Sequence, residues 1–342
     1  MSWRLSIWVL SAASLAAQGP HSVNDTIDLV RTALRGKQTD RQTARSLRKW
    51  KLSESLDARA VEELESDGAG PATVAELERL RLASAALPKP ATAPAFDSPP
   101  VPAPQEQSRI VEEARTIALT YTDSLPNFIA IESVRRYTGD HGSWRLKDTL
   151  HIKLSYFEKA EDYAVMTVNG RPSNLAYEAI GGTISEGEFG SMLREVFEPR
   201  SRAELHWDHW TRLRGRPAHV YSFRVRPEHS RYTMAYGNSS GRHTITAGQH
   251  GFVYVDAETR QIVRIASEAD SIPEDFLVRS SATSLDYGFA DVGGQRYLLP
   301  LRAEVHMTTP SLDTRNEVEF QSYQKFAADS SIRYEGPVPP KK

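Results

Sequence analysis

Alternation of apolar and polar residues is the clearest pattern in the chain, and residues 144–156 show it best. The apolar residues of one parity are Trp144, Leu146, Leu150, Ile152, Leu154 and Tyr156. Because successive side chains of a strand point to opposite faces, this segment predicts a long strand with one buried and one solvated face. Similar alternation returns as far as residue 323, and Asn169-Gly170 and Gly293-Gly294 predict tight hairpin turns.

Helical spacing of apolar residues marks the remaining regions. Residues 22–87 predict four short helices, and Gly68-Ala-Gly-Pro71 forms the turn into the last of them. A longer helix is predicted before Leu125-Pro126, and another after a capping box made by Ser185 and Glu188. About ten strands and two helices, without strand–helix alternation, predict an α+β domain around a curved antiparallel sheet.

Proline divides the chain into its predicted domains. Residues 88–106 combine many prolines with alanine, serine and threonine, a composition that favours an extended, semi-rigid linker. We therefore expect a small all-α domain over residues 22–87, the linker over 88–106 and the antiparallel sheet domain over 107–335.

The first residues predict export. Met1-Ser-Trp-Arg4 carries a positive charge, residues 5–15 are mostly apolar, and Ser14-Leu-Ala16 is a small-x-small cleavage site. These features predict a signal peptide over residues 1–16 and a secreted protein, periplasmic or extracellular in a bacterium. The alternative is an uncleaved anchor helix, which the short apolar segment disfavours; no later segment has the ~20 apolar residues of a membrane span.

Composition narrows the functional classes. The 342 residues are 39% hydrophobic and 25% charged, typical of a soluble globular protein, and the net charge is −2. No global field therefore draws the chain to nucleic acid or to an anionic membrane. The chain has no cysteine, which excludes disulfides, thiolate zinc sites, a cysteine nucleophile and a lipidated N-terminal cysteine.

Three segments resemble the lipoprotein-carrier superfamily. Residues 215–225 form a strand after Gly-Arg, residues 251–259 end in an Asp-x-Glu-Thr turn, and residues 293–300 form a late hairpin ending in proline. The superfamily includes the periplasmic carrier and outer-membrane receptor for lipoproteins and a related envelope-stress sensor domain (LolA/LolB/RseB-type). The resemblance, over about residues 108–335, implies an incomplete β-barrel wrapped around helices, with an apolar cavity for acyl chains or a partner's hydrophobic segment.

Two predicted strands supply candidate residues for such a cavity. Tyr221 and Phe223 share one parity of the first strand, and Tyr232 and Met234 share one parity of the second. Aromatic and methionine side chains line adaptable apolar pockets, so these four are the candidate ligand-binding residues. The alternative is that they only pack the core, as most apolar strand faces do.

Catalytic motifs are weak. Gly237-Asn-Ser239-Ser-Gly241 matches the Gly-x-Ser-x-Gly nucleophile elbow, which requires a strand before the serine and a helix after it. A strand pattern follows instead, and Asn, Ser and Gly are common hairpin-loop residues. We therefore predict that the protein is not an enzyme. A serine hydrolase using Ser239 with His219 or His250 is the remote alternative.

Metal and nucleic-acid sites are also disfavoured. In a strand, His206 and Asp208 share one face while His209 faces the other way, so one ion reaches all three only through a bulge. The Gly68–Pro71 turn resembles a helix-hairpin-helix motif, and basic residues of 37–51 precede it. Acidic residues of 54–67 are available to pair with them. We expect a structural turn, no nucleic-acid partner, and neither a metal nor another cofactor.

These patterns together favour an exported, non-enzymatic binding protein of the cell envelope. Its half-barrel would hold an apolar ligand or a lipidated or peptide partner, and its helical domain would dock an envelope protein. An extracellular structural or protein-interaction module with a closed core is the alternative.

Overall fold

The computed structural model describes residues 19–91, 99–140, 143–180, 190–238 and 241–326. The predicted signal peptide and the predicted capping box of Ser185 and Glu188 lie outside these residues. The chain divides into two compact units between residues 96 and 97, a boundary within the range predicted as the linker.

The first unit contains four helices in the order predicted. They are α1 (Val23–Arg35), α2 (Asp40–Leu47), α3 (Ala58–Ser66) and α4 (Pro71–Ser84). Their apolar faces meet in a core that includes Val30, Leu47, Leu64 and Leu77, each fully buried. Helix α1 begins with a capping box, in which the Ser22 hydroxyl accepts from the amide of Asp25 and the Asp25 carboxylate accepts from the amide of Ser22.

The second unit is an open antiparallel sheet, which confirms the predicted α+β class. Its eleven strands within the described residues are β1 (Phe128–Asp140), β2 (Ser143–Phe157), β3 (Ala160–Val168), β4 (Arg171–Pro172), β5 (Glu204–Leu213), β6 (Arg216–Val225), β9 (Gly248–Asp256), β10 (Ile262–Asp270), β11 (Ser280–Val292), β12 (Gln295–Thr309) and β13 (Leu312–Lys325). They are ordered β4-β3-β2-β1-β13-β12-β11-β10-β9-β6-β5. A separate ribbon pairs β7 (Thr233–Asn238) with β8 (Gly241–Thr246).

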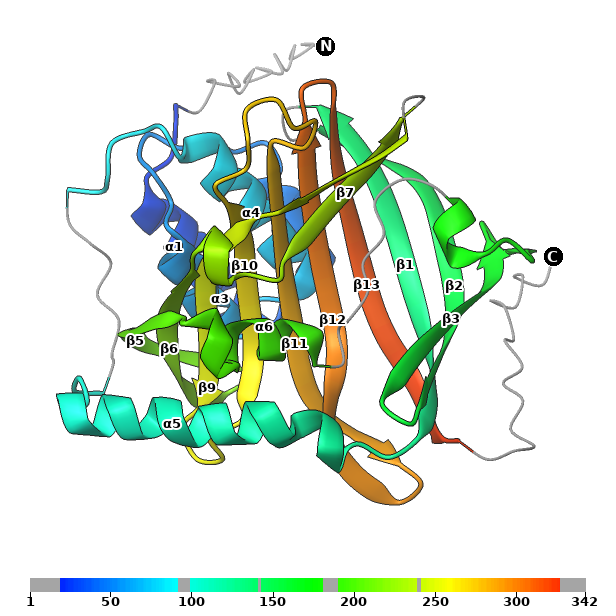
Figure 1. Cartoon of the computed structure of the whole chain (residues 1–342). Coiled ribbons are helices and arrows are strands. Elements are labelled where there is room, and N and C mark those ends of the chain that lie inside the picture. Colours follow the sequence, from blue (N-terminus) through cyan, green and yellow to red (C-terminus); the bar gives the residue numbers. More distant parts are fainter. Residues whose placement is uncertain (1–18, 92–98, 141–142, 181–189, 239–240, 327–342) are drawn as a thin grey trace, which may run out of the picture. The chain divides into compact units, whose positions relative to one another are not determined.

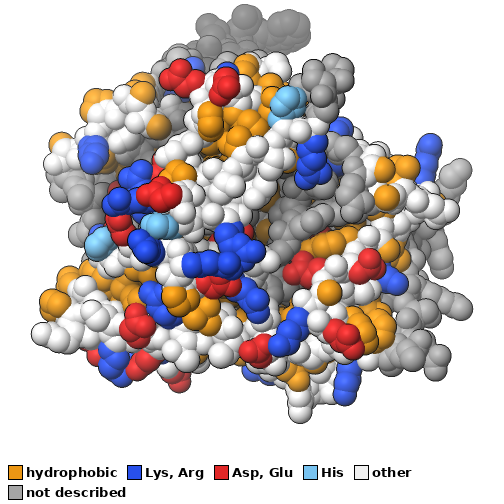
Figure 2. Space-filling model, in the orientation of Figure 1, with side chains coloured by type: hydrophobic (Ala, Val, Ile, Leu, Met, Phe, Trp, Pro, Cys, Tyr) orange, Lys and Arg blue, Asp and Glu red, His pale blue; other side chains and the backbone are white. Residues whose placement is uncertain are grey.

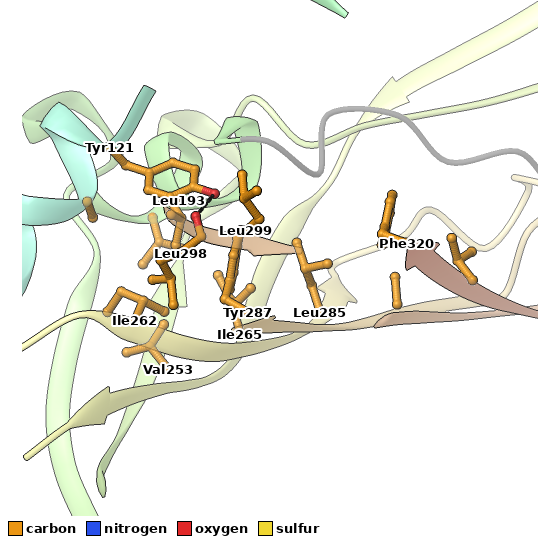
Figure 3. Close-up of a cluster of buried hydrophobic side chains, with 14 of the residues drawn as sticks. Tyr121, Leu193, Val253, Ile262, Ile265, Leu285, Tyr287, Leu298, Leu299 and Phe320 are labelled. Atoms are coloured by element: carbon orange, nitrogen blue, oxygen red, sulfur yellow. Dashed lines mark hydrogen bonds between the residues drawn. The ribbon is translucent and has the colours of Figure 1, made fainter. Parts of the chain in front are cut away.

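Two helices and the ribbon lie over the concave face of this sheet (Figure 1). Helix α5 (Pro104–Thr120) continues into the 3₁₀ turn η1 (Tyr121–Ser124), and α6 (Ser191–Phe197) lies in front of the central strands. Ile110, Ala114 and Ala118 form the buried face of α5 and join the same core cluster as the strand residues. The Tyr121 hydroxyl donates to the carbonyl oxygen of Leu298 at 3.0 Å (Figure 3).

Helix α5 begins earlier than the sequence pattern indicates. Its first residue is Pro104, inside the range predicted as linker. Proline is favourable in the first turn of a helix because its missing N–H would have no partner there. The small side chains of Ala114 and Ala118 let the helix lie close against the sheet.

A β-bulge divides the long strand predicted from residue 144. The register of β1 and β2 shifts between Arg136 and Tyr137, so residues on either side of the shift reverse faces. Leu146 is consequently 51% exposed. Trp144 lies against the Arg315 guanidinium, 5.1 Å from the ring centre, on the face opposite Leu150. The prediction of a long strand is confirmed, but the prediction of one continuous buried face is wrong.

Alternation in the sequence does not predict strand β5. Its sequence mixes tryptophan, histidine, aspartate and arginine, and a register shift between Trp207 and His209 interrupts its pairing with β6. The bulge residue is Asp208. Strand β5 forms one end of the sheet, where such irregularities are common.

Candidate binding surface on the concave face of the sheet

Six strands bring one apolar residue each into a continuous row. Reading across the sheet, the directly opposed residues are Ile265, Leu285, Ala303, Val318, Val134 and Leu150. All six are at most 3% exposed, and they share a core cluster with Ala114 of α5 and Leu193 of α6. We call these six the apolar row. It lies on the concave face, under the helices.

The next row along the same strands is mostly polar. Its members, in the same order across the sheet, are Ser267, Thr283, Val305, Asn316, Arg136 and Asp148. We call the five polar members the polar row; Val305 interrupts them. Side chains two residues apart on a strand share a face, so this row also belongs to the concave face. Thr283 is half-buried and the other four are buried.

One end of the polar row contains an internally neutralised ion pair. The Arg136 guanidinium donates two hydrogen bonds, both 2.7 Å long, to the Asp148 carboxylate. The two side chains are 5% and 11% exposed. A forked pair of this kind satisfies both charges within one geometry. Asn316 lies directly opposite Arg136 on the neighbouring strand, so the row provides hydrogen-bonding groups without a net charge.

The other end of the polar row meets helix α6. The Ser267 hydroxyl donates to Gln249 Oε1 at 3.0 Å, and Gln249 Nε2 donates to Glu195 Oε2 of α6 at 3.4 Å. Burial raises the pKa of Glu195, and the hydrogen bond from Gln249 only partly offsets that rise. Burial therefore disfavours the charged form of Glu195 at this end of the row. Figure 2, from the same side as Figure 1, shows basic side chains gathered over α6.

The predicted ligand-binding residues lie in two different clusters. Tyr221 and Phe223 belong to the main core, and the Tyr221 hydroxyl donates to the carbonyl of Gln107 in α5 at 2.9 Å. Met234 lies in a smaller cluster under the ribbon, and Tyr232 packs against that cluster. The Tyr232 hydroxyl lies 3.0 Å from Ser281 Oγ. The polar row runs between the two regions and was not identified from the sequence.

An aromatic cluster fixes the beginning of α5. Trp207 Nε1 donates to Nδ1 of His219 at 3.3 Å, and the Trp210 ring lies 3.9 Å from the His219 ring, between centroids. Trp210 Nε1 donates to the carbonyl of Pro100 at 3.0 Å. Burial, assisted by nearby Arg260, lowers the pKa of His219 to about 4. His219 is therefore neutral at pH 7 and accepts the Trp207 bond.

The Asp256–Thr259 turn and Arg216 join two neighbouring strands through one carboxylate. The Arg216 guanidinium donates to both oxygens of Asp256, at 2.6 and 2.9 Å. The same carboxylate accepts from the amide and hydroxyl of Thr259, which closes the Asp-x-x-Thr turn. Burial alone would raise the pKa of Asp256, but these donors lower it to about 2. The motif thus holds β6 and β9 together.

The two paired strands on either side of Ser239 contradict the hypothesis of a nucleophile elbow. Strand β8 begins at Gly241 and pairs antiparallel with β7, so the Gly-x-Ser-x-Gly sequence joins two strands of a hairpin. An elbow requires a helix at this position. Ser239 itself lies outside the described residues.

The predicted metal ligands do not form a cluster. The bulge at Asp208 changes the alternation of β5, and Asp208 Oδ2 lies 2.6 Å from Nδ1 of the adjacent His209. Within the described ranges, no group of three or more histidine, aspartate or glutamate side chains is placed to hold a metal ion.

The turn at Gly68–Pro71 is structural, because an internal carboxylate occupies the helix terminus behind it. Gly68 has a φ of +109°, and Pro71 begins α4. The Asp40 carboxylate accepts from the amides of Ala72 and Thr73, both at 2.8 Å. These N–H groups are the ones that a phosphate would need.

Ion pairs in the first unit differ from the pairing that the sequence suggests. Arg48, at the end of α2, pairs with Glu76 of α4 at 3.1 Å. Asp67, one of the acidic residues after α2, pairs with Arg31 of α1 at 2.6 Å.

Comparison with solved structures finds proteins of the lipoprotein-carrier type. A LolA superfamily protein from Nitrosomonas europaea is 10% identical, with 64% of this chain and 93% of that chain covered and a TM-score of 0.34. A putative outer membrane lipoprotein-sorting protein domain from Vibrio parahaemolyticus is 12% identical, with 66% and 94% covered and a TM-score of 0.30. The MucA/MucB complex of Pseudomonas aeruginosa matches at 10% identity, 62% and 93% coverage and a TM-score of 0.16.

The solved structures found are of the type that the sequence resemblance names. No protein-family profile and no curated protein sequence matches the chain. At such identities the likeness concerns the fold alone, and TM-scores below 0.5 leave ligand and mechanism to this chain's own residues. Of the helices within the described ranges, none is long and apolar enough to cross a membrane.

Proposed function

We propose that the protein is an exported, non-enzymatic binding protein that holds an apolar ligand, or a lipidated or peptide partner, on the concave face of its half-barrel. The observation that carries this proposal is the apolar row. It lies on an unclosed sheet whose cover is two helices and a ribbon rather than a second sheet. Small-molecule sites are concave and mostly apolar, and the mouths of β-barrels are among the places where they occur.

Helix α6 is the part of the cover whose movement would admit a ligand. It has only seven residues, and Leu193, Val196 and Phe197 are its buried side chains. Two polar contacts link it to α5 and η1: Arg115 donates to the carbonyl of Phe197, and Arg194 donates to the Thr122 hydroxyl, both at 2.8 Å. Short elements with few buried contacts open at lower free energy than the sheet beneath them.

The four residues predicted from the sequence would join the site in its open form. Tyr221 and Phe223 become accessible when α5 moves, and Tyr232 and Met234 become accessible when the ribbon moves. Export rests on the signal-peptide pattern of residues 1–16. The helical unit would dock an envelope partner through its exposed surface.

A closed-core interaction module is the second candidate, because the apolar row is at most 3% exposed. In that case the helices are permanent parts of the core, and function lies on the loops or the helical unit. The two candidates differ in whether α6 leaves the sheet when an apolar chain is added.

A fluorescent label on α6 tests this difference directly. The chain has no cysteine, so Ser191→Cys provides a single labelling position at the exposed start of α6. Ser108→Cys on the exposed side of α5 is the matched control. With glycerol monolaurate or a synthetic diacylated lipopeptide, we expect a saturable change at residue 191, a smaller change at residue 108 and a higher melting temperature.

The same titration decides between the candidates. Unchanged fluorescence at both positions and an unchanged melting temperature, with every amphiphile added, would reject the binding proposal and support the closed-core module. Native mass spectrometry of the protein purified from its own envelope would then identify any bound cargo or its absence.

A further inference from the structure

The bulge in β5 brings two tryptophan side chains onto one face of the sheet. Trp207 and Trp210 have opposite parity in the sequence, so a regular strand would direct them to opposite faces. Because the register shifts after Trp207, it lies opposite Tyr221 of β6, whereas Trp210 lies opposite His219. Tyr221 and His219 share a parity, so both indoles lie on the concave face. Strand β5 ends the sheet on the side where α5 begins (Figure 1).

The contacts of the aromatic cluster formed by Trp207, Trp210 and His219 hold the Trp210 ring in place. Trp207 packs against the main core and donates to His219 Nδ1, and the His219 ring lies against the Trp210 ring. The indole N–H of Trp210 therefore has a fixed direction. It donates to the carbonyl oxygen of Pro100 at 3.0 Å. The cluster thus presents one preorganised donor to a backbone carbonyl.

The group that receives this donor belongs to a proline-rich stretch of the same chain. Residues 99–103, Pro-Pro-Val-Pro-Ala, lead into α5, and we call them the proline segment. Its last residue, Ala103, has φ −60° and ψ 150°, values close to the polyproline II conformation. A backbone in this conformation makes no internal hydrogen bonds, so its carbonyl groups are available to donors on a partner surface.

The proline segment is held through the carbonyl groups of its prolines. Pro100 accepts from Trp210, and Pro102 accepts from Nε2 of Gln107 at 2.8 Å. The side chain of Val101, between the two prolines, is 66% exposed. The hydrogen bonds therefore depend on the extended backbone and on the prolines that favour it, and the intervening side chain points to solvent.

This arrangement matches the general chemistry by which proteins bind proline-rich peptides. A polyproline II segment is already extended before it binds, so it docks on aromatic side chains at a low cost in conformational entropy. The proline segment is attached directly to α5, which gives it an effective concentration on the order of millimolar at the aromatic cluster. A proline-rich segment of another protein therefore competes with it for the same donor.

We propose that the aromatic cluster is a binding site for a proline-rich segment of a partner protein, which takes the place of residues 99–103. The inference does not depend on whether the concave face holds an apolar ligand. Exchange breaks the hydrogen bonds to Pro100 and Pro102. The hydrogen bond from the Tyr221 hydroxyl to the carbonyl of Gln107 does not involve the proline segment, so the beginning of α5 stays attached to β6.

A peptide titration tests the site. The probe is the synthetic peptide Pro-Pro-Val-Pro-Ala-Pro-Gln, and the control peptide has alanine in place of each proline. The indole N–H resonances of the ¹⁵N-labelled full-length mature protein report binding, and Trp210→Phe identifies the resonance of Trp210. We expect the probe to shift this resonance saturably. The control peptide should not shift it, and neither peptide should shift that of Trp144 on the convex face.

A variant with a weakened proline segment tests the exchange. Pro100→Ala with Pro102→Ala lowers the preference of the segment for polyproline II, so the peptide should bind about 10-fold more tightly than to the unmodified protein. Adding Trp210→Phe retains a ring beside His219 but removes the donor, and should weaken this binding about 5-fold. Trp144→Phe is the matched control and should change nothing. The anisotropy of a fluorescein-labelled peptide measures these affinities.

Three outcomes would overturn the proposal. The first is an unchanged Trp210 resonance in both proteins at millimolar peptide. The second is binding by the weakened-segment variant alone, because residues 99–103 would then be a permanent occupant. The third is equal binding of the alanine peptide, which would show that proline is not recognised. Should circular dichroism reveal that Trp210→Phe unfolds the chain, sequential assignment of the indole resonances in the unmodified protein replaces that variant.

Discussion

The two faces of the sheet use the same ionic groups in different ways. On the convex face, Asp286 of β11 accepts hydrogen bonds from Arg264 of β10 and Arg302 of β12, so one carboxylate joins three strands. On the concave face, Arg136 of β1 donates two hydrogen bonds to Asp148 of β2, so this ion pair joins two strands.

The difference indicates what each face requires. Arg302 is 34% exposed and so keeps part of its hydration, whereas Asp286 is buried. A positive excess is therefore tolerable on the convex face, where water reaches it. On the concave face, Arg136 and Asp148 are both buried and balance one another, and Glu132 of the same face is 1% exposed. The Asp286 carboxylate thus joins three strands on the convex face, whereas the Arg136–Asp148 pair joins two on the concave face.

The largest expected effect is the loss of the convex carboxylate. Asp286→Asn leaves the buried Arg264 guanidinium without its counter-charge, and we expect a loss of about 3–5 kcal/mol in the free energy of unfolding. Urea denaturation at pH 7 measures it. The contrasting variant is the double replacement Arg136→Met with Asp148→Leu, which removes both charges and should change stability by less than about 1–2 kcal/mol. Equal losses for the two variants would contradict the distinction between the faces.

Acid should destabilise the protein in two separate windows. The pKa of His219 is about 4 in the folded protein, below its ordinary value of 6.5, so the unfolded chain binds more protons between these values. Stability is therefore lost as the pH falls from 6.5 to 4, by up to about 3 kcal/mol. The pKa of Asp256 is about 2, below its ordinary 3.8, so its contribution is lost only as the pH falls from about 4 to 2.

Unfolding measured at half-unit pH steps separates these windows. His219→Gln should remove most of the loss in the upper window and leave the lower one; burial also lowers the pKa of His151, which contributes to the remainder. A variant that still lost the same stability between pH 6.5 and 4 would show that His219 is not the responsible group.

The smallest expected effect has the opposite sign. Burial raises the pKa of Glu195, so its charge opposes folding at pH 7. Glu195→Gln retains the side-chain shape and should stabilise the protein by less than about 1 kcal/mol at pH 7, with no gain at pH 3, where both side chains are neutral. Guanidinium unfolding at the two pH values measures it. Destabilisation at pH 7 would show that the charged form of Glu195 stabilises the folded protein, as Asp286 does on the convex face.

Local sequence signals account for the elements but not for their alignment. Asn169 and Gly170 have φ values of +52° and +74°, as the predicted hairpin requires, and Gly293 and Gly294 adopt positive φ as well. Such turns depend on two residues, so the sequence reveals them. The reversal of faces before Asp148 depends on a bulge, and nothing in strand alternation marks one.

The polar row shows more clearly which features the sequence alone does not reveal. Ser267, Thr283 and Asn316 look like ordinary strand residues in the sequence, because each has at least one polar residue beside it. Their relation arises only when the registers of several antiparallel pairs combine. A single-residue shift in one pair would move that strand's member to the other face. A choice of candidate residues by type alone, such as Tyr221 and Met234, therefore identifies apolar clusters. It does not identify the polar row that lies between them.

The open sheet also determines how the protein behaves toward its own copies. Because the sheet does not close, it ends in two strands whose outer backbone groups could template a further strand from another molecule. One end, β4, has two residues and includes Pro172, which lacks an N–H to donate. The other end, β5, has a bulge at Asp208 and charged Glu204 and Arg212. Both ends thus hinder pairing with a strand of another copy, so the sheet can stay open without growing into a polymer.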